Sequence, residues 1–199
     1  MQKNILEYLE STVKRLPDKL AYADEQMGLT FSDVYREARS IGSFLIGKEI
    51  YREPVVVFMK KQPRTIAAFF GAIYGGNFYV PLDEEMPRFR IEMIFNKLNP
   101  KAVICDKSTE QLVKSFAFSG EAYLYDDIIN TPIEEEKLWS IRDRAIDTDP
   151  IYIVFTSGST GIPKGVVACH RSVIDYVDNL MDILKANEDT VFGNQTPFY

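Results

Sequence analysis

The amino-acid sequence predicts an α/β fold, a layered and mainly parallel sheet with helices on both faces. Short apolar runs alternate with segments of helical periodicity along most of the 199 residues, as in chains built from strand–helix–strand units. The run PVVVFM at 54–59 is β-branched and uninterrupted, which is typical of a strand buried on both faces. The sheet is therefore expected to carry helices on each side.

The first elements are expected to be a hairpin and a helix. Two short strands are predicted within 20–31, with the turn at the Met27–Gly28 pair. Residues 32–48 then show helical periodicity, and Ser32 is expected to cap this helix because its hydroxyl can accept a free backbone N–H. The segment before them, residues 1–16, is charged and amphipathic, so it is not a signal peptide.

Strands and helices then alternate through the middle of the chain. The predicted helix over 64–76 ends on two glycines, a common helix stop, and the helix over 87–99 starts on a proline. A further helix over 108–116 opens with a Ser-Thr pair that is expected to cap it. The other predicted strands lie at 77–82, 101–106 and 121–127.

Two stretches carry weaker patterns. Residues 130–149 are acidic and weakly periodic, and we interpret them as a surface connection. Residues 191–199 are apolar and aromatic, like a strand cut in mid-course, so the sequence is expected to be a fragment of a longer protein. The predicted division gives a first α/β subdomain at 1–149, followed at 150–199 by a loop, a strand and a helix that begin a second subdomain.

Composition narrows the class of protein. The net charge of -6 argues against a surface for nucleic acid or an anionic membrane. No apolar run approaches the roughly 18 residues needed to cross a membrane, and a cytoplasmic location is expected. The single histidine, His170, excludes a His-rich metal site, and we interpret 134–136 as a solvated acidic loop. Cys105 and Cys169 are expected to be small buried hydrophobes in a reducing compartment.

The segment from Thr156 to Gly165, TSGSTGIPKG, carries the strongest chemical signal. Its glycines permit backbone angles that other residues resist, and successive N–H groups can then line a concave anion site. Hydroxyl groups and the Lys164 ammonium add donors, a set that suits the oxygens of a polyphosphate. The candidate residues are Thr156, Ser157, Gly158, Ser159, Thr160, Gly161, Lys164 and Gly165.

This segment does not fit the common phosphate motifs. The usual loop needs Gly-Lys-Ser/Thr opening a helix, whereas here Pro163 precedes Lys164 and the next residues, VVACH, are β-like. The spaced-glycine dinucleotide motif also fails, because no helix opens on the third glycine. A flexible surface turn is the alternative, and the Pro-Lys-Gly ending between two apolar strands favours the phosphate site. A Ser–His–Asp hydrolase is disfavoured, since SGSTG lacks the nucleophile-elbow spacing, and His170 is interpreted as structural.

The stretch YIVFTSGSTGIPKGVV resembles the phosphate loop of the adenylate-forming enzymes. That family contains acyl-CoA synthetases, luciferases and the adenylation domains of nonribosomal peptide synthetases. The resemblance implies that the loop holds the β- and γ-phosphates of ATP while a carboxylate attacks the α-phosphorus, which yields an acyl-adenylate and pyrophosphate. Lys164 would be the catalytic residue, screening charge on the pyrophosphate. ATP and Mg²⁺ are the implied cofactors, and the metal ligand is expected beyond Tyr199.

A second block points to one branch of that family. YVPLD at 79–83, followed by Pro87 and Arg90, is similar to amino-acid-activating enzymes that load a carrier protein, although Tyr74–Gly76 departs from their usual Lys-Ala-Gly. The implied partners are an amino acid or other small carboxylic acid and the phosphopantetheine thiol of a carrier protein, with no nucleic acid and no membrane. Asp83 and Arg90 are interpreted as structural, a turn carboxylate and an exposed helix cation.

Other functions stay open at this point. In the family that the sequence resembles, the acyl pocket, the adenine contacts and a small C-terminal domain follow later in the chain, so these 199 residues alone are expected to be inactive. The alternatives are a non-catalytic nucleotide- or carrier-binding module and an acyl-CoA synthetase. A kinase-like phosphotransferase is weaker, because metal-binding aspartates are not evident.

Overall fold

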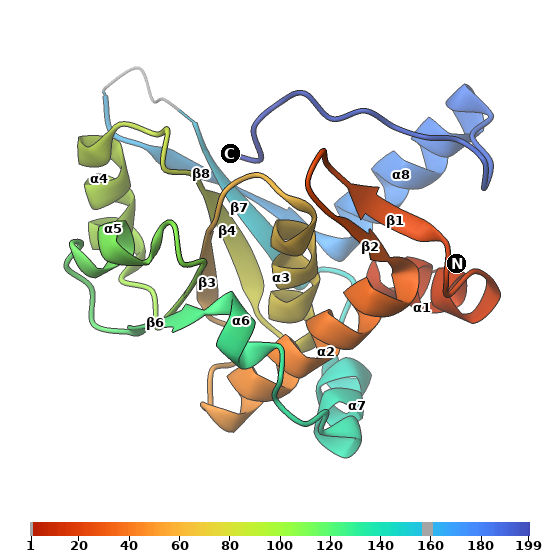
Figure 1. The fold of residues 1–199 in the computed structure, drawn as a ribbon, viewed down its shortest axis with the longest axis horizontal. Coiled ribbons are helices and arrows are strands. Elements are labelled where there is room, and N and C mark those ends of the chain that lie inside the picture. The colour runs from red at the N-terminus through yellow and green to blue at the C-terminus, as the bar shows by residue number, and fades with distance from the viewer. Residues whose placement is uncertain (1, 157–160) are drawn as a thin grey trace.

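The computed structural model describes residues 2–156 and 161–199, and a six-stranded sheet lies at its centre (Figure 1). The strand order is β6-β5-β3-β4-β7-β8. Neighbours from β6 to β7 pair in parallel, and β8 pairs antiparallel with β7. The mainly parallel sheet is thus confirmed. Its strands are β3 (Pro54–Phe58), β4 (Phe78–Leu82), β5 (Ala102–Cys105), β6 (Glu121–Leu124), β7 (Pro150–Thr156) and β8 (Lys164–Cys169).

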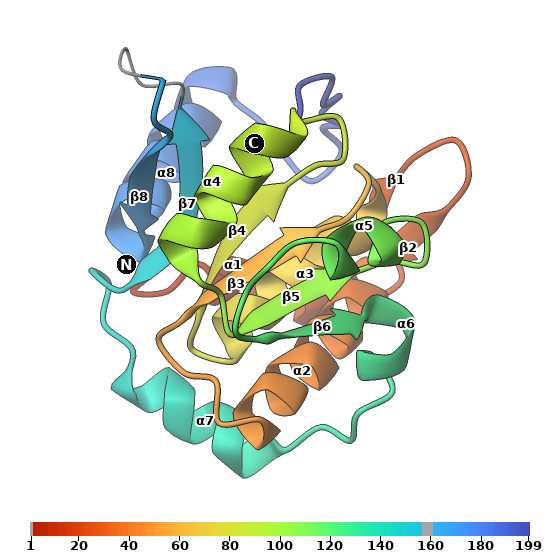
Figure 2. The same ribbon diagram turned by 90° about the vertical axis from the view of Figure 1, so that its left-hand side faces the viewer.

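Helices cover both faces of this sheet. In Figure 1, α2 and α3 lie on one side of the strands and α4 and α5 lie on the other; Figure 2 gives the view from the side of α4. None of the described helices is long and apolar enough to span a membrane. The helices are α1 (Leu6–Arg15), α2 (Phe31–Gly47), α3 (Pro63–Tyr74), α4 (Arg88–Leu98), α5 (Glu110–Lys114), α6 (Tyr125–Ile128), α7 (Glu135–Arg144) and α8 (His170–Leu184).

Strand β3 shows why both faces are buried. Val55 and Val57 belong to the apolar core that includes α2 and α3, whereas Val56 and Phe58 belong to the core that includes α4. All four side chains are almost fully buried. Because successive side chains of a strand point to opposite faces, an uninterrupted apolar run is what a central strand between two helical layers requires.

The predicted N-terminal hairpin is present, with two differences in detail. It consists of β1 (Leu20–Ala23) and β2 (Gly28–Thr30). The turn is at Asp24–Met27 rather than Met27–Gly28, because the Asp24 carboxylate accepts the N–H groups of Gln26 and Met27 at 2.8 Å. The cap of α2 is Thr30 and not Ser32. The Thr30 hydroxyl accepts the N–H of Asp33 at 3.1 Å, and the Asp33 carboxylate accepts the N–H of Thr30 in return.

Three other predictions of local structure were wrong. The strand predicted at 121–127 ends at Leu124, and Tyr125 begins α6, with its buried hydroxyl donating to the Glu37 carboxylate. The acidic stretch 130–149 contains α7, which buries Leu138 and Ile141. Residues 191–199 form no strand, although Phe198 packs edge-on against Phe69 on α3 at 5.5 Å between ring centres.

The predicted cap of α5 also differs. Neither Ser108 nor Thr109 supplies a side-chain cap to this helix. The Thr109 hydroxyl instead donates to the carbonyl of Phe58 at 2.7 Å, across to the end of β3. A buried tertiary hydrogen bond has therefore replaced the local one.

Gly120 lies where the structure leaves no room for a side chain. A Cβ at this position would come within 2.3 Å of the carbonyl oxygens of Pro100 and Lys101. We expect Gly120→Ala to lower the free energy of unfolding by about 2–4 kcal/mol, since backbone would have to move. Gly47→Ala, at the end of α2 with nothing within 4 Å, should be neutral or stabilising by up to about 1 kcal/mol. Urea denaturation compares the two, and equal losses would contradict the prediction.

Candidate functional site

The candidate loop connects β7 to β8 at one edge of the sheet. Strand β7 is parallel to β4, and β4, β3, β5 and β6 pair in parallel in turn. The carboxyl ends of these strands and the start of the loop therefore share an edge (Figure 1). In open α/β sheets, ligands bind at this edge.

Four of the eight candidate residues lie within the described chain. Thr156 ends β7 and Lys164 begins β8, and the two are paired in the antiparallel register. The Thr156 hydroxyl donates to the Lys164 carbonyl at 3.4 Å, and both residues are exposed. The base of the loop is thus formed by two paired residues that carry a hydroxyl and an ammonium. The candidates that lie outside the described residues are Ser157, Gly158, Ser159 and Thr160.

The two described glycines of the loop are favoured at their positions for different physical reasons. Gly161 has φ of +76° and open space around it, a conformation that side-chained residues rarely adopt. Gly165 has no positive φ, but a Cβ there would lie 2.8 Å from a methyl group of Ile153 on β7. The first glycine therefore serves the backbone angle, and the second serves close packing between the strands.

Helix α4 contacts both flanks of the loop. Arg90 donates through Nη2 to the carbonyl of Phe155 at 2.8 Å, and Lys97 donates to the carbonyl of Pro163 at 3.4 Å. Arg90 is half-buried rather than exposed as predicted, and its Nε has no hydrogen-bond partner in the described part of the chain. The hydrogen bond to Phe155 is a specific contact through which Arg90 can play the structural role predicted for it. Sequence reasoning missed Lys97, whose only signal is its place about two helical turns after Arg90, on the same face.

Arg90 is expected to contribute more stability than Lys97. Replacing Arg90 by methionine leaves the Phe155 carbonyl without its donor, which should cost about 1–2 kcal/mol in the free energy of unfolding. Lys97→Met is the matched control on the same helix. It should cost less than about 0.5 kcal/mol, because its hydrogen bond is longer and the lysine is an exposed residue. Urea denaturation measures both, and equal costs would show that the 2.8 Å bond is not the stronger tether.

His170 lies away from the loop. It begins α8 after β8 has crossed the sheet from Lys164 to Cys169, so it lies at the opposite edge. The residue is 3% exposed, and its Nδ1 accepts the N–H of Ile5 at 3.2 Å. Burial, and secondarily the charge of Arg142, lowers the pKa of His170 to about 4. These features agree with a structural role.

Asp83 and the two cysteines are placed as the sequence suggested, with one difference. Asp83 follows β4 and its carboxylate accepts the N–H of Glu85 at 2.7 Å, as a turn carboxylate does. Cys105 is fully buried, and burial raises its pKa to about 11. Cys169 is only half-buried. Both thiols are free.

The described groups at the loop are of the kind that bind phosphate, and no metal site is evident beside them among the described residues. The exposed ammonium of Lys164, the Thr156 hydroxyl and the positive φ of Gly161 are what a phosphate-binding loop offers. Among residues 2–156 and 161–199, no group of three or more His, Cys, Asp or Glu side chains could hold a metal ion. The stretch 134–136 is not the loop that was predicted, because Glu135 and Glu136 form the first turn of α7, and Glu135 pairs with Arg39.

Solved structures share this fold. The complex of VinN with 3-methylaspartate superposes with a TM-score of 0.76 at 22% identity, covering 94% of this chain and 54% of VinN. A fatty acid AMP ligase from Legionella pneumophila gives a TM-score of 0.80 at 18% identity, covering 96% of this chain and 34% of the ligase. At these identities the likeness concerns the fold.

Sequence relatives identify the family. A D-alanine–D-alanyl carrier protein ligase of Listeria monocytogenes is 30% identical over 203 aligned residues, which are 100% of this chain and 39% of the ligase. Tyrocidine synthase 1 of Brevibacillus parabrevis is 30% identical over 172 residues, 86% of this chain and 16% of the synthase. The chain therefore spans well under half the length of these relatives. The family described as AMP-binding enzyme matches residues 9–199, and the chain belongs to this family.

Proposed function

We propose that the protein to which this chain belongs activates an amino acid, or another small carboxylic acid, with ATP. A carboxylate oxygen attacks the α-phosphorus, the bond from that phosphorus to the β-phosphate oxygen breaks, and pyrophosphate leaves. The thiol of a carrier-protein phosphopantetheine arm then attacks the acyl carbon, loses its proton, and displaces AMP. The observation that carries the proposal is the pairing of Thr156 with Lys164 at the carboxyl edge of the sheet, in a member of the AMP-binding enzyme family.

The loop would act by positioning and by charge. Its hydroxyl and N–H donors would hold the β- and γ-phosphates, and the Lys164 ammonium would offset the charge that develops on the leaving pyrophosphate. Adenylate-forming enzymes in general use ATP and Mg²⁺, and the metal supplies further charge neutralisation when bound. The full proposed set is Thr156, Ser157, Gly158, Ser159, Thr160, Gly161, Lys164 and Gly165.

A carrier protein is the favoured acceptor. The relatives named above include a D-alanine–D-alanyl carrier protein ligase and tyrocidine synthase 1. The segment YVPLD at 79–83 supports the same branch. An acyl-CoA synthetase is the alternative within the family, and a non-catalytic binding module is the alternative outside it.

Isotope exchange tests the proposal. The protein that contains this chain should exchange labelled pyrophosphate into ATP when the correct amino acid is supplied, and the 199-residue chain alone should not. A kinase would instead release ADP, and a binding module would do neither. Exchange by the isolated chain would show that the catalytic groups have been misplaced, and absence of exchange with any carboxylic acid would favour the binding module.

A further inference from the structure

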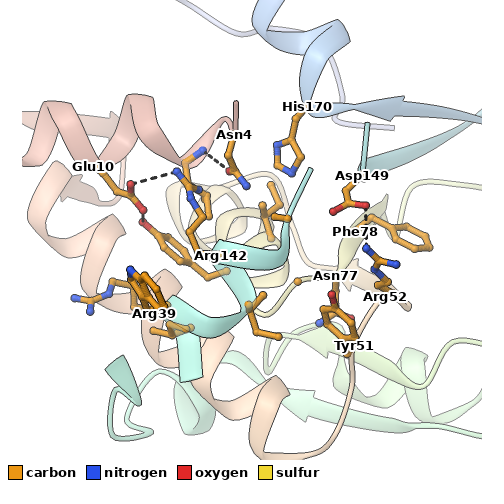
Figure 3. Close-up of a pocket in the computed structure, with 18 of the residues that line it drawn as sticks. Asn4, Glu10, Arg39, Tyr51, Arg52, Asn77, Phe78, Arg142, Asp149 and His170 are labelled. Carbon is orange, nitrogen blue, oxygen red and sulfur yellow. Dashed lines mark hydrogen bonds and ion pairs between the residues drawn. The ribbon is translucent and has the colours of Figure 1, made fainter. Parts of the chain in front are cut away.

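A cavity of about 310 Å³ lies at the edge of the sheet opposite the loop (Figure 3). Its lining includes Asn77 just before β4, Asp149 just before β7, and His170 just after β8. These positions are the amino ends of parallel strands and the far end of β8, whereas the loop leaves the carboxyl end of β7. The cavity is therefore separate from the proposed nucleotide site.

His170 presents a hydrogen-bond donor to this cavity. The imidazole is 3% exposed and reaches from the start of α8 into the space between Asn4 and Asp149 (Figure 3). Its Nδ1 accepts the Ile5 N–H, so in the neutral ring the proton is on Nε2. Among residues 2–156 and 161–199, no hydrogen bond uses Nε2 as its donor, and Nε2 is not one of the fully buried atoms that lack a partner. Because burial of the ring keeps it uncharged at neutral pH, this N–H is a neutral donor that is open to the cavity and has no acceptor in the described part of the chain.

Arg142 adds positive charge beside His170. Its Nη2 makes two long contacts, at 3.5 Å to Glu7 and 3.4 Å to Glu10. Its Nη1 is buried and has no partner within the described residues. Glu10 also accepts the Tyr74 hydroxyl at 3.2 Å, so this carboxylate is shared. Two carboxylates therefore face this guanidinium on its Nη2 side, and Nη1 is the group that is left without an acceptor.

The other charged side chains that line the cavity are paired with side chains of opposite charge. Asp149 pairs with Arg52 at 3.3 Å and accepts the N–H of Ile146 at 3.0 Å. Glu135 pairs with Arg39. With these carboxylates engaged, the groups left without partners are donors, and they favour a ligand that brings an acceptor with negative charge.

The remaining walls are largely apolar and aromatic. The cavity volume is at the lower end of small-molecule sites, which run from about 300 to 1,000 Å³. Such walls suit a small apolar body rather than a sugar or a nucleotide. The residues that form them include Tyr51, Ile73, Phe78, Leu138 and Ile141.

We propose that this cavity binds a small organic carboxylate. One carboxylate oxygen accepts the His170 Nε2–H, the charge lies beside the Arg142 guanidinium, and the apolar body lies against the aromatic walls. The proposal does not depend on the adenylation reaction, because it concerns the opposite edge of the sheet.

Benzoate is a probe of suitable size and chemistry. Titration calorimetry of the 199-residue chain at pH 7 should show saturable binding with a Kd on the order of 1 mM. Benzamide, which lacks the charge, and benzylamine, which reverses it, should bind at least about tenfold more weakly. In NMR spectra, benzoate should shift the amide signals of Gly76 and Asn77 and leave those of Gly161 and Gly165 unchanged.

Two substitutions of His170 separate the loss of the hydrogen-bond donor from an effect on the fold. His170→Asn keeps an oxygen that can accept the Ile5 N–H but removes the donor at the cavity, and should weaken benzoate binding at least about tenfold. His170→Gln keeps an N–H near the Nε2 position and should remain within about threefold of the unmodified chain. Lys164→Gln, at the loop, should leave the affinity for benzoate unchanged.

Several results would overturn the proposal. Absence of saturable binding would mean that the cavity holds only water. Benzylamine binding as tightly as benzoate would mean that the carboxylates of the cavity, and not its donors, determine which ligand binds. Amide shifts at Gly161 and Gly165 in place of Gly76 and Asn77, or sensitivity to Lys164→Gln, would place benzoate at the loop. The NMR measurement needs no variant, so the test stands even if His170→Asn fails to fold.

Discussion

Replacing Lys164 by alanine is expected to lower the turnover of the protein that contains this chain by about 100-fold. The KM for ATP should rise by less than about threefold. Lys164 is exposed at the base of the loop, and its backbone pairs with that of Thr156. Negative charge grows on the pyrophosphate oxygens as the α–β bond breaks, so a cation there stabilises the transition state more than bound ATP. Steady-state kinetics of pyrophosphate exchange at varied ATP gives both constants.

The control is a lysine at the other edge of the sheet. Lys101 precedes β5 and pairs with Glu53 at 2.6 Å, so Lys101→Ala removes the same charge far from the loop and should leave both constants within about twofold. Equal losses in turnover and ATP affinity for Lys164→Ala would mean that the lysine binds substrate and transition state alike. No loss at all would remove Lys164 from the site.

Acid is expected to destabilise the fold through His170, by about 2–3 kcal/mol between pH 7.5 and pH 4.5. The pKa of this buried imidazole is lowered to about 4, whereas that of an unfolded histidine is near the ordinary 6.5. Between these values the unfolded chain binds a proton that the folded chain does not, so stability falls as the pH falls. The loss begins near pH 6.5 and levels off below about pH 4. Urea denaturation at several pH values measures it.

His170→Asn separates this loss from the titration of carboxylates. The amide does not titrate but can still accept the Ile5 N–H. The variant is expected to be less stable at pH 7.5 but to lose about 2 kcal/mol less on acidification than the unmodified chain. Parallel losses in the two proteins would show that the imidazole is not held neutral, and that other groups carry the acid sensitivity.

The layered fold could be predicted because its central strands are buried on both faces. In β3, every residue from Val55 to Phe58 is apolar. In a chain where strands and helices alternate, that pattern predicts a strand buried on both faces. Helix α7 was missed because only Leu138 and Ile141 face the core, too few for a periodic signal. The cap of α2 was misplaced because Thr30 and Ser32 have similar capping chemistry, and the path of the chain out of β2 decides between them.

The site could be predicted only where its residues are adjacent in sequence. The loop has an unusual local composition, from which Gly161 and Lys164 could be predicted as candidate phosphate-binding residues. The contacts of α4 join Arg90 to a carbonyl 65 residues away and Lys97 to one 66 residues away, and no local pattern reports such pairs. The cavity at the opposite edge is assembled from ends of several elements, so its unmatched donors become evident only in three dimensions.

The α4 contacts at the ends of the loop have an evolutionary consequence. The backbone carbonyls of Phe155 and Pro163 are held by side chains of α4, and Phe155 is also held by strand pairing. Substitutions within the loop can therefore abolish chemistry while leaving the fold intact, so selection on folding and selection on catalysis act on different residues. In a mutational scan, abundance in the cell should tolerate changes in the loop that growth dependent on the product rejects. Copies of this gene that drift after duplication would persist as folded proteins long after losing activity.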